Sequence, residues 1–204
     1  MRIFLFPTVF TFIKVADQVN GHGYASRPRS VFDHTKGIYT EFVALTDASI
    51  NPAFKGGIYN HAPIDNWRNF NDRWEATGYK TLAEMLDPLI NGCGRSDDKA
   101  PPVDVSGFTE FWWQNDEYKE GLLKSHYGPC AIGCHQKEHF FHHNCAAKFT
   151  TFPAKIPFDY SKCPGKSILT FHWLALHQEK WQVYSTFYQL KPLTLSKRPT
   201  LSLF

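Results

Sequence analysis

The sequence predicts an all-β fold, an antiparallel β-sandwich with short helical insertions, from three observations. The second half of the chain contains short runs rich in aromatic and β-branched residues. Gly, Pro and Lys residues separate these runs, as turns between strands do. The apolar leader at the amino terminus is typical of an exported chain. We therefore expect an immunoglobulin- or fibronectin-III-like sandwich with strands in residues 108–114, 128–134, 140–149, 167–176 and 181–190.

The first half of the chain predicts strands at its start and two helices further on. Residues 23–32 read as an extended strand and turn, and residues 33–63 as loops with brief strands. A first helix is expected from Asp65, a possible cap, because Trp67, Phe70 and Trp74 follow at helical spacing. A second begins with the capping-box sequence from Thr81 to Glu84 and stops at Gly92. We expect the aromatic side chains of these helices to pack a core.

The amino terminus reads as a secretory signal peptide. Arg2 precedes an apolar run over residues 3–13, and a small residue, Gly21, stands at a plausible cleavage site. The run is shorter than the roughly 20 residues that a membrane-spanning helix needs. A buried first strand or an uncleaved anchor is the alternative. We expect a signal peptide over 1–21, a single domain over 22–192 and a loose tail over 193–204, in a chain that is secreted and extracellular.

The charge balance excludes a strongly basic protein. The formal net charge is +3, and loss of Arg2, Lys14 and Asp17 with the leader lowers it to about +2. This is far from the charge of a polybasic nucleic-acid binder. No second apolar segment approaches membrane-spanning length. We therefore expect neither a nucleic-acid partner nor a membrane partner, and a monomer.

Five cysteines in an exported chain predict two disulfides and one remaining thiol. If residues 130–145 form a hairpin that turns at Lys137-Glu138, Cys130 and Cys145 face each other across the two strands. This pair is our disulfide candidate. The other pairings stay open.

Cleavage after Gly21 would make His22 the first residue of the mature protein. It would then carry a free α-amino group next to an imidazole, and these two nitrogens can chelate one metal ion.

A second set of histidines invites a zinc interpretation, but its Cys-x10-Cys spacing does not match a zinc knuckle and a hairpin directs alternate side chains to opposite faces. We expect these residues to be solvated hairpin side chains: Cys134, His135, His139, His142, His143 and Cys145.

A more promising group lies outside that cluster. His126 sits in a loop just before a strand, followed by a Gly-Pro turn, and His177 closes a later strand. Gln182 and Tyr184 lie two residues apart on the next strand, so they point to the same face. Nitrogen donors and a phenol suit copper redox chemistry better than zinc hydrolysis.

An ordered series of motifs resembles the lytic polysaccharide monooxygenases, and more narrowly the oomycete pectin-active family, family seventeen of the auxiliary activity enzymes. The resemblance covers residues 108–184 together with His22 and Gly23. The segments that carry it are Trp113-Gln114-Asn115, Ser125-His126-Tyr127-Gly128-Pro129-Cys130, Cys145-Ala146-Ala147, Phe152-Pro153-Ala154-Lys155-Ile156-Pro157, Asp159-Tyr160-Ser161-Lys162-Cys163, Trp173-Leu174-Ala175-Leu176-His177 and Trp181-Gln182.

The resemblance implies a copper cofactor and a role for each candidate residue. His22 and His126 would form the histidine brace that holds copper, and Tyr184 would be the axial ligand. His177 and Gln182 would be second-sphere catalytic residues, a role in which outer groups orient ligands and tune the metal. The implied reaction uses an external electron donor and hydrogen peroxide or dioxygen to oxidise a glycosidic carbon of a cell-wall polysaccharide, above all pectic homogalacturonan.

The sequence departs from the family pattern at several cysteines. The family has further cysteines after those matching Cys93 and Cys163 and after the axial tyrosine. Ser96, Ser167, and Thr186 or Phe187 stand near these places here. Cys134 has no counterpart in the family, so we expect it to be the free thiol.

Two other functions remain as alternatives. One is a secreted carbohydrate-binding or copper-binding protein of the same fold without turnover. The other, a zinc-dependent hydrolase, lacks any His-Glu-x-x-His motif.

Overall fold

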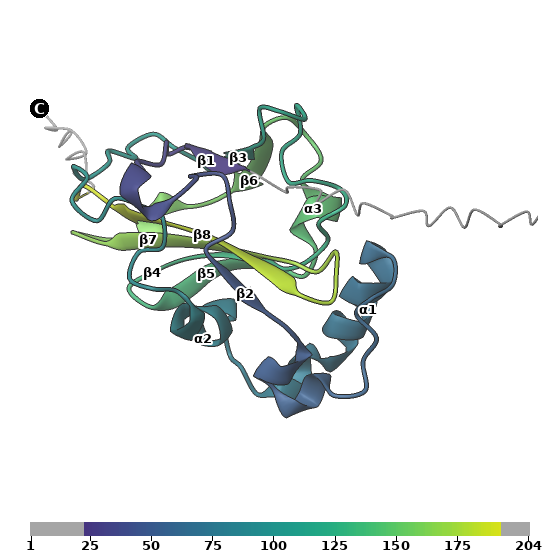
Figure 1. Cartoon of the computed structure of the whole chain (residues 1–204). Helices are drawn as coiled ribbons and strands as arrows, with labels where there is room; N and C mark the ends of the chain where they lie inside the picture. Colours follow the sequence, from purple (N-terminus) through teal and green to yellow (C-terminus); the bar gives the residue numbers. More distant parts are fainter. Residues whose placement is uncertain (1–22, 193–204) are drawn as a thin grey trace, which may run out of the picture.

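The computed structural model of this chain describes residues 23–192. Its regular structure is mostly β-strand, in two antiparallel sheets with a few short helices, which is consistent with a β-sandwich. Figure 1 shows the smaller sheet lying over the larger one. The predicted signal peptide, His22 and the predicted tail lie outside the described residues. Between residues 23 and 192, no helix has the length and apolar character needed to cross a membrane.

The larger sheet has five strands in the order β2-β8-β7-β4-β5. Its central hairpin pairs Ile168 with Gln189 at one end and Ala175 with Gln182 at the other. The predictions for these two strands are therefore confirmed to within one residue at each end. The strand bounds are β2 Ala44–Thr46, β4 Cys130–Cys134, β5 Lys137–His142, β7 Ile168–Ala175 and β8 Trp181–Gln189.

The smaller sheet has three strands in the order β1-β3-β6, with bounds β1 Tyr24–Arg27, β3 Glu110–Gln114 and β6 Ala154–Pro157. The inner faces of both sheets bury aromatic side chains against each other, and the rings of Phe111 and Phe171 stack with centroids 4.6 Å apart. Sequence reasoning missed β6, a four-residue strand that ends in proline.

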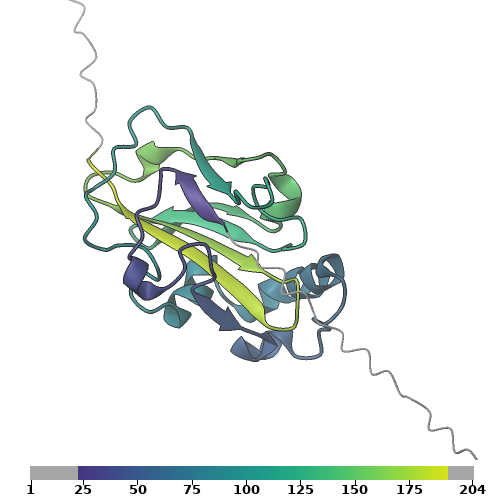
Figure 2. The same cartoon turned by 45° about the horizontal axis from the view of Figure 1, so that its top comes forward.

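A second core lies on the outer face of the larger sheet. Figures 1 and 2 both place α1 and α2 on this side. Phe70 and Trp74 of α1 pack there, and Phe70 meets Trp181 edge to face at 5.3 Å. The helical aromatics therefore pack a core as expected. The helices are α1 Pro63–Trp74, α2 Leu82–Leu86 and α3 Cys145–Lys148, with 3-10 turns at His34–Lys36, Ala48–Ile50, Pro52–Phe54, Glu75–Thr77, Asp87–Leu89 and Tyr160–Lys162.

The helix signals in the sequence were correct for α2 and shifted for α1. The Thr81 side chain accepts a hydrogen bond from the Glu84 N–H, so the predicted cap of α2 is confirmed. Asp65 is not the cap of α1. The helix begins two residues earlier at Pro63, because the fixed φ of proline suits the first helical position and its missing N–H costs nothing there.

The β4–β5 hairpin turns one pair of residues earlier than the sequence predicted. His135 and Gln136 form the turn, both with positive φ, and Cys134 pairs with Lys137. The segment after His142 leaves the sheet and forms α3, so the predicted strand over 140–149 is wrong in its second half. Asn144 ends the strand because its side chain caps α3, accepting from the Ala147 N–H.

Candidate functional site

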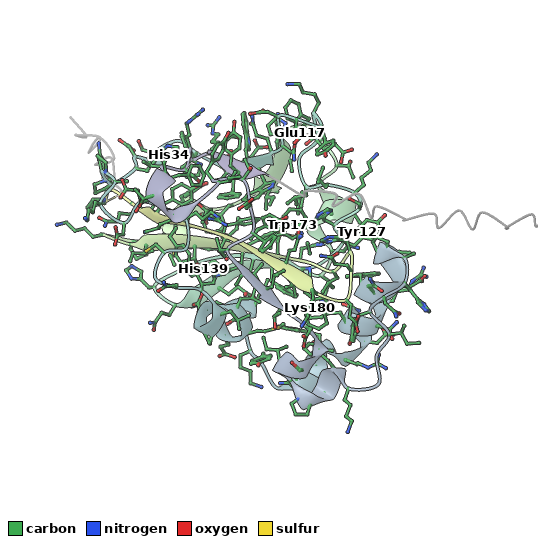
Figure 3. All side chains as sticks on the ribbon, viewed as in Figure 1. His34, Glu117, Tyr127, His139, Trp173 and Lys180 are labelled. Atoms are coloured by element: carbon green, nitrogen blue, oxygen red, sulfur yellow. A yellow bond between two sulfur atoms is a disulfide. The ribbon has the colours of Figure 1, made fainter. Side chains whose placement is uncertain are left out.

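Two histidines predicted from separate parts of the sequence meet at one end of the larger sheet. The imidazole rings of His126 and His177 stack with centroids 3.9 Å apart and planes 22° apart. His126 is fully buried, and its Nδ1 lies 2.8 Å from Ser125 Oγ, which fixes the orientation of the ring. Figure 3 labels the next residue, Tyr127, close to the α1 and α3 end of the molecule. The two histidines therefore belong to one site.

The loop that carries His126 is held by backbone contacts. The Leu176 N–H donates to the Tyr127 carbonyl (2.8 Å), so the loop follows the end of β7. Gly128 has a φ of 156°, and a β-carbon at this position would lie 1.8 Å from the Leu174 carbonyl oxygen. Only glycine fits this approach. The Gly-Pro turn that the sequence singled out is therefore a requirement of the close packing.

Tyr184 and Gln182 share one face of β8, as their spacing predicts. The Tyr184 hydroxyl donates to Gln182 Oε1 at 2.6 Å, and both side chains are buried. Burial raises the pKa of the Tyr184 phenol well above its ordinary value, and Glu41 adds to this shift. The phenol is therefore neutral at physiological pH.

Trp173 joins the histidine pair to the tyrosine. Its ring centroid lies 5.9 Å from that of His126 and 4.9 Å from that of Tyr184, on which it stacks. Figure 3 labels Trp173 near the middle of the molecule. Sequence reasoning used this tryptophan only as part of a motif. Its period-two spacing from Ala175 on β7 could have placed it on the same face as the site.

The described chain begins close to this aromatic group. The Gly23 N–H donates to the Thr40 carbonyl (3.1 Å), and a β-carbon on Gly23 would lie 2.4 Å from Trp113 Nε1. Trp113 in turn meets Tyr184 edge to face at 6.1 Å. His22, the predicted terminal ligand, precedes Gly23 and lies outside the described residues.

The electrostatics of the site favour neutral imidazole. Burial lowers the pKa of His177 to about 4, and within residues 23–192 its Nδ1 is buried without a hydrogen-bond partner. At physiological pH this ring is therefore uncharged. A neutral His177 ring would not repel a cation held by the neighbouring His126.

A buried amide on α1 supports the site from outside. Asn66 Nδ2 donates to the Leu176 carbonyl (2.9 Å), and Asn66 Oδ1 accepts from the His61 N–H (3.0 Å). The side chain is fully buried and ties the helix to the residue before His177. No local sequence pattern marks this asparagine, so its role could not be predicted.

Two disulfides brace the loops around the sheet. Cys130 and Cys145 are bonded as predicted, with Cα atoms 5.8 Å apart. They do not face each other in a hairpin: Cys130 pairs with His142, and Cys145 starts α3. The second disulfide joins Cys134 to Cys163, and Cys93 is the free thiol. The expectation that Cys134 is free was therefore wrong. Disulfides of this kind fit an oxidising compartment.

The cluster around the hairpin forms no metal site in the described part of the chain. Cys134 and Cys145 are used in different disulfides, and no group of three or more His, Cys, Asp or Glu side chains within residues 23–192 is arranged to hold a metal ion. His135 Nε2 instead lies 2.7 Å from Ser167 Oγ, and His142 Nδ1 accepts from the Asn144 N–H.

The described site thus brings together His126, His177, Gln182 and Tyr184 around buried tryptophans, next to the point where the chain continues to His22. Its side chains offer imidazole nitrogen and a neutral phenol oxygen in a largely buried setting. Comparison of the chain with models of known protein families and with curated proteins found no match.

Proposed function

We propose that this chain is a secreted copper-dependent lytic polysaccharide monooxygenase that cleaves plant cell-wall polysaccharide, in particular pectic homogalacturonan. One observation carries the proposal: His126 stacks on His177 next to Trp173 and Tyr184, while Gly23, the residue after His22, lies against Trp113 in the same aromatic group. The proposal is supported by the links among the described residues: Trp173 contacts both His126 and Tyr184, and Tyr184 is hydrogen-bonded to Gln182.

Copper fits the chemistry of the donors. Imidazole nitrogen is a preferred ligand of copper, and a buried neutral phenol is a weak one. His22 would supply its amino nitrogen and imidazole, His126 a second imidazole, and Tyr184 the axial oxygen. When bound there, copper supplies one-electron redox chemistry with an external electron donor and hydrogen peroxide or dioxygen.

The surrounding residues would orient and protect this chemistry. Gln182 Oε1 accepts a hydrogen bond from the Tyr184 hydroxyl, so the amide holds the phenol oxygen in place. His177 keeps a neutral imidazole beside His126 and presents a buried Nδ1 that has no other described partner. Trp173 and Trp113 exclude water from the inner side. Such outer groups orient the ligands of a metal site and tune the metal.

The proposal also specifies pectin as the substrate and an immunoglobulin-like topology for the sandwich. Homogalacturonan is a polyanion, and a cationic aromatic surface lies on the smaller sheet. The side-chain cations of Arg27 and Lys155 each lie 5.0 Å from the Trp112 ring. Trp112 pairs directly with Lys155 across β3 and β6 and with Arg27 across β1. Long-range attraction to an acidic polymer would assist encounter.

The deciding experiment combines metal binding with product analysis on the secreted chain. Amino-terminal sequencing first establishes whether His22 is the terminal residue. Wild type, His22→Ala, His126→Ala and the hairpin control His139→Ala are then loaded with Cu(II) and studied by electron paramagnetic resonance. We expect a nitrogen-rich copper spectrum in wild type and His139→Ala, and its loss or a clear change in the two site variants.

Products distinguish catalysis from binding. Wild type with copper and reductant is expected to release oxidised oligosaccharides from pectin, detected by mass spectrometry. A mature terminus other than His22, or no oxidised product from pectin, cellulose and chitin, would contradict the proposal. Tight copper binding without reductant-dependent consumption of peroxide would instead favour the non-catalytic copper-binding alternative.

A further inference from the structure

The outer face of the smaller sheet carries a row of three side chains across its strands. Trp112 of the central strand β3 pairs with Arg27 of β1 on one side and with Lys155 of β6 on the other. Directly paired residues point to the same face of a sheet. Phe111 and Trp113, the neighbours of Trp112 in the chain, lie in the core, so the row faces outward. Figure 1 shows α1 and α2 on the opposite side of the molecule.

The guanidinium group of Arg27 is held between two aromatic rings. Its Cζ lies 4.2 Å from the centroid of the Phe108 ring and 5.0 Å from that of Trp112. Nε is buried without a hydrogen-bond partner, whereas the terminal nitrogens Nη1 and Nη2 reach solvent and donate to no group in residues 23–192. The rings therefore fix the guanidinium plane and leave its terminal donors open. Such an arginine is pre-organised to bind a carboxylate through two parallel hydrogen bonds.

Lys155 brings a second cation to the same tryptophan from the other side. Its side chain is exposed, and Nζ lies 5.0 Å from the centroid of the Trp112 ring. Neither Lys155 nor Arg27 forms an ion pair with a carboxylate in the described part of the chain. Two like charges on either side of one ring repel each other, and a bound anion would offset this repulsion.

The carboxylates of this face are engaged elsewhere and lie to either side of the row along β3. Glu110 Oε2 accepts from Trp112 Nε1 (2.7 Å). At the other end, the Asp116 carboxylate accepts from the Tyr24 hydroxyl (2.9 Å) and from Gln114 Nε2 (2.6 Å). An acidic polymer would be attracted at the row and repelled on both sides of it. It would therefore lie across the strands, along the row, and not along β3.

We propose that the row Arg27-Trp112-Lys155 anchors an acidic polysaccharide, a polyuronate chain that crosses the smaller sheet with one carboxylate on Arg27 and another on Lys155. The choice of a polyuronate rests on the proposed function, because homogalacturonan carries a carboxylate on each unesterified sugar. The anchor is separate from the copper site, since Trp113 points to the opposite face of β3 and contacts Tyr184. It would hold the polymer beside the enzyme and raise its effective concentration without taking part in oxidation.

The test measures binding and not oxidation, on the full secreted chain without added copper. Oligogalacturonates and fully methyl-esterified oligogalacturonates of the same length are titrated by calorimetry at low and at physiological salt. We expect saturable binding of the acid form that weakens as salt rises, because exposed ion pairs are screened. Binding of the ester form is expected to be at least about tenfold weaker, because it lacks the charged hydrogen bonds.

Variants of the row locate the binding. Lys155→Gln changes an exposed side chain and is expected to weaken binding of the acid form several-fold. Arg27→Gln together with Lys155→Gln is expected to weaken it at least about tenfold. The matched control removes two exposed cations elsewhere, Lys55→Gln with Lys137→Gln, and is expected to bind as wild type does.

A variant that strengthens binding guards against effects of misfolding. Glu110→Gln removes the nearest negative charge and keeps an oxygen that can accept from Trp112 Nε1. It is expected to bind the acid form about two- to fivefold more tightly than wild type, because repulsion of the polymer is removed.

The proposal is overturned if the acid form does not bind, if the ester form binds equally well, or if the Arg27 and Lys155 double variant binds as its control does. Equally tight binding of duplex DNA or of vesicles containing phosphatidylserine would show general anion binding and would also overturn it. Failure here would leave copper binding and oxidation at the copper site untouched, and failure of the copper tests would leave this titration unaffected.

Discussion

The imidazole of His177 lies face to face with that of His126, with ring centroids 3.9 Å apart, although 50 positions separate the two residues in the sequence. Two charged rings at this distance would repel each other in a buried site. The lowered pKa of His177, about 4, removes that repulsion because the ring is neutral over the physiological range. The stack therefore joins a candidate ligand to a second ring that remains free of charge.

Replacing His177 tests what its nitrogens contribute beyond packing. His177→Phe keeps an aromatic face against His126 and removes both ring nitrogens. If His177 acts as a second-sphere group, turnover on pectin with copper and reductant is expected to fall about 10- to 100-fold. Copper affinity, measured by calorimetry, is expected to change much less.

His139→Phe is the matched control, because this histidine lies on the β5 strand of the hairpin. Its turnover is expected to remain that of wild type. Unchanged turnover in His177→Phe would assign that residue a packing role only.

Asn66 is expected to be a determinant of stability at the same end of the fold. Asn66→Ala leaves the Leu176 carbonyl and the His61 N–H without their partner in a fully buried setting. Loss of two buried hydrogen bonds is expected to lower the free energy of unfolding by about 2–3 kcal/mol in urea denaturation. Asn60→Ala, at an exposed position, is expected to stay within about 0.5 kcal/mol of wild type. Equal stabilities would show that water replaces the amide.

The strands of the second half could be predicted because their signal is local. The pairing of β7 with β8 follows from two aromatic runs separated by a short polar turn, and the boundaries agree to within a residue. The strand over 140–149 failed because Asn144 caps a helix within an apolar run, and composition alone did not reveal this. The pairing of Cys134 with Cys163 depends on how β4 lies beside the loop before β7, which is a tertiary property.

The candidate site was predictable only in part for the same reason. The common face of Gln182 and Tyr184 follows from strand geometry. The stack of His126 on His177 depends on the loop over residues 121–129 closing onto the end of β7, which requires Gly128 to approach the Leu174 carbonyl. Asn66 reaches the site from a different helix, so no spacing in the sequence connects it to Leu176.

A contact between two buried hydroxyl side chains offers a site for an introduced disulfide. Ser96 and Thr186 are both buried, and Ser96 Oγ lies 3.4 Å from Thr186 Oγ1 across 90 residues of sequence. Ser96→Cys together with Thr186→Cys, made in a Cys93→Ser background to avoid a competing thiol, is expected to form a disulfide. Closing so long a loop is expected to raise the free energy of unfolding by about 4–5 kcal/mol. Loss of the Thr186 hydrogen bond to Ser30 is expected to lower it by about 1 kcal/mol.

The measurements for this pair are a thiol titration and thermal unfolding with and without reductant. The oxidised variant is expected to show no free thiol and a melting temperature above that of the Cys93→Ser parent, with the difference lost on reduction. Two titratable thiols under oxidising conditions would show that the two side chains do not meet in the required geometry.

Glu138 predicts a specific pH dependence of stability. Burial raises the pKa of its carboxyl above the ordinary value, and the hydrogen bond from the Leu82 N–H and the charge of Glu84 modify this shift in opposite directions. Because the folded chain holds this proton more tightly than the unfolded chain, the contribution of Glu138 is most favourable below its ordinary pKa. It declines as the pH rises through the raised pKa.

Glu138→Gln removes the titration and keeps an oxygen that can accept the Leu82 N–H. Relative to wild type, this variant is therefore expected to be more stable at pH 7 than at pH 4, as measured by urea unfolding at both values. Glu75→Gln, an exposed carboxylate at the end of α1, is the control for general charge removal. A stability difference between Glu138→Gln and wild type that is equal at the two pH values would contradict a raised pKa, because the effects of burial and of the Leu82 N–H would then cancel. A difference that favours wild type more at pH 7 than at pH 4 would mean that the Leu82 N–H stabilises the carboxylate more than burial disfavours it.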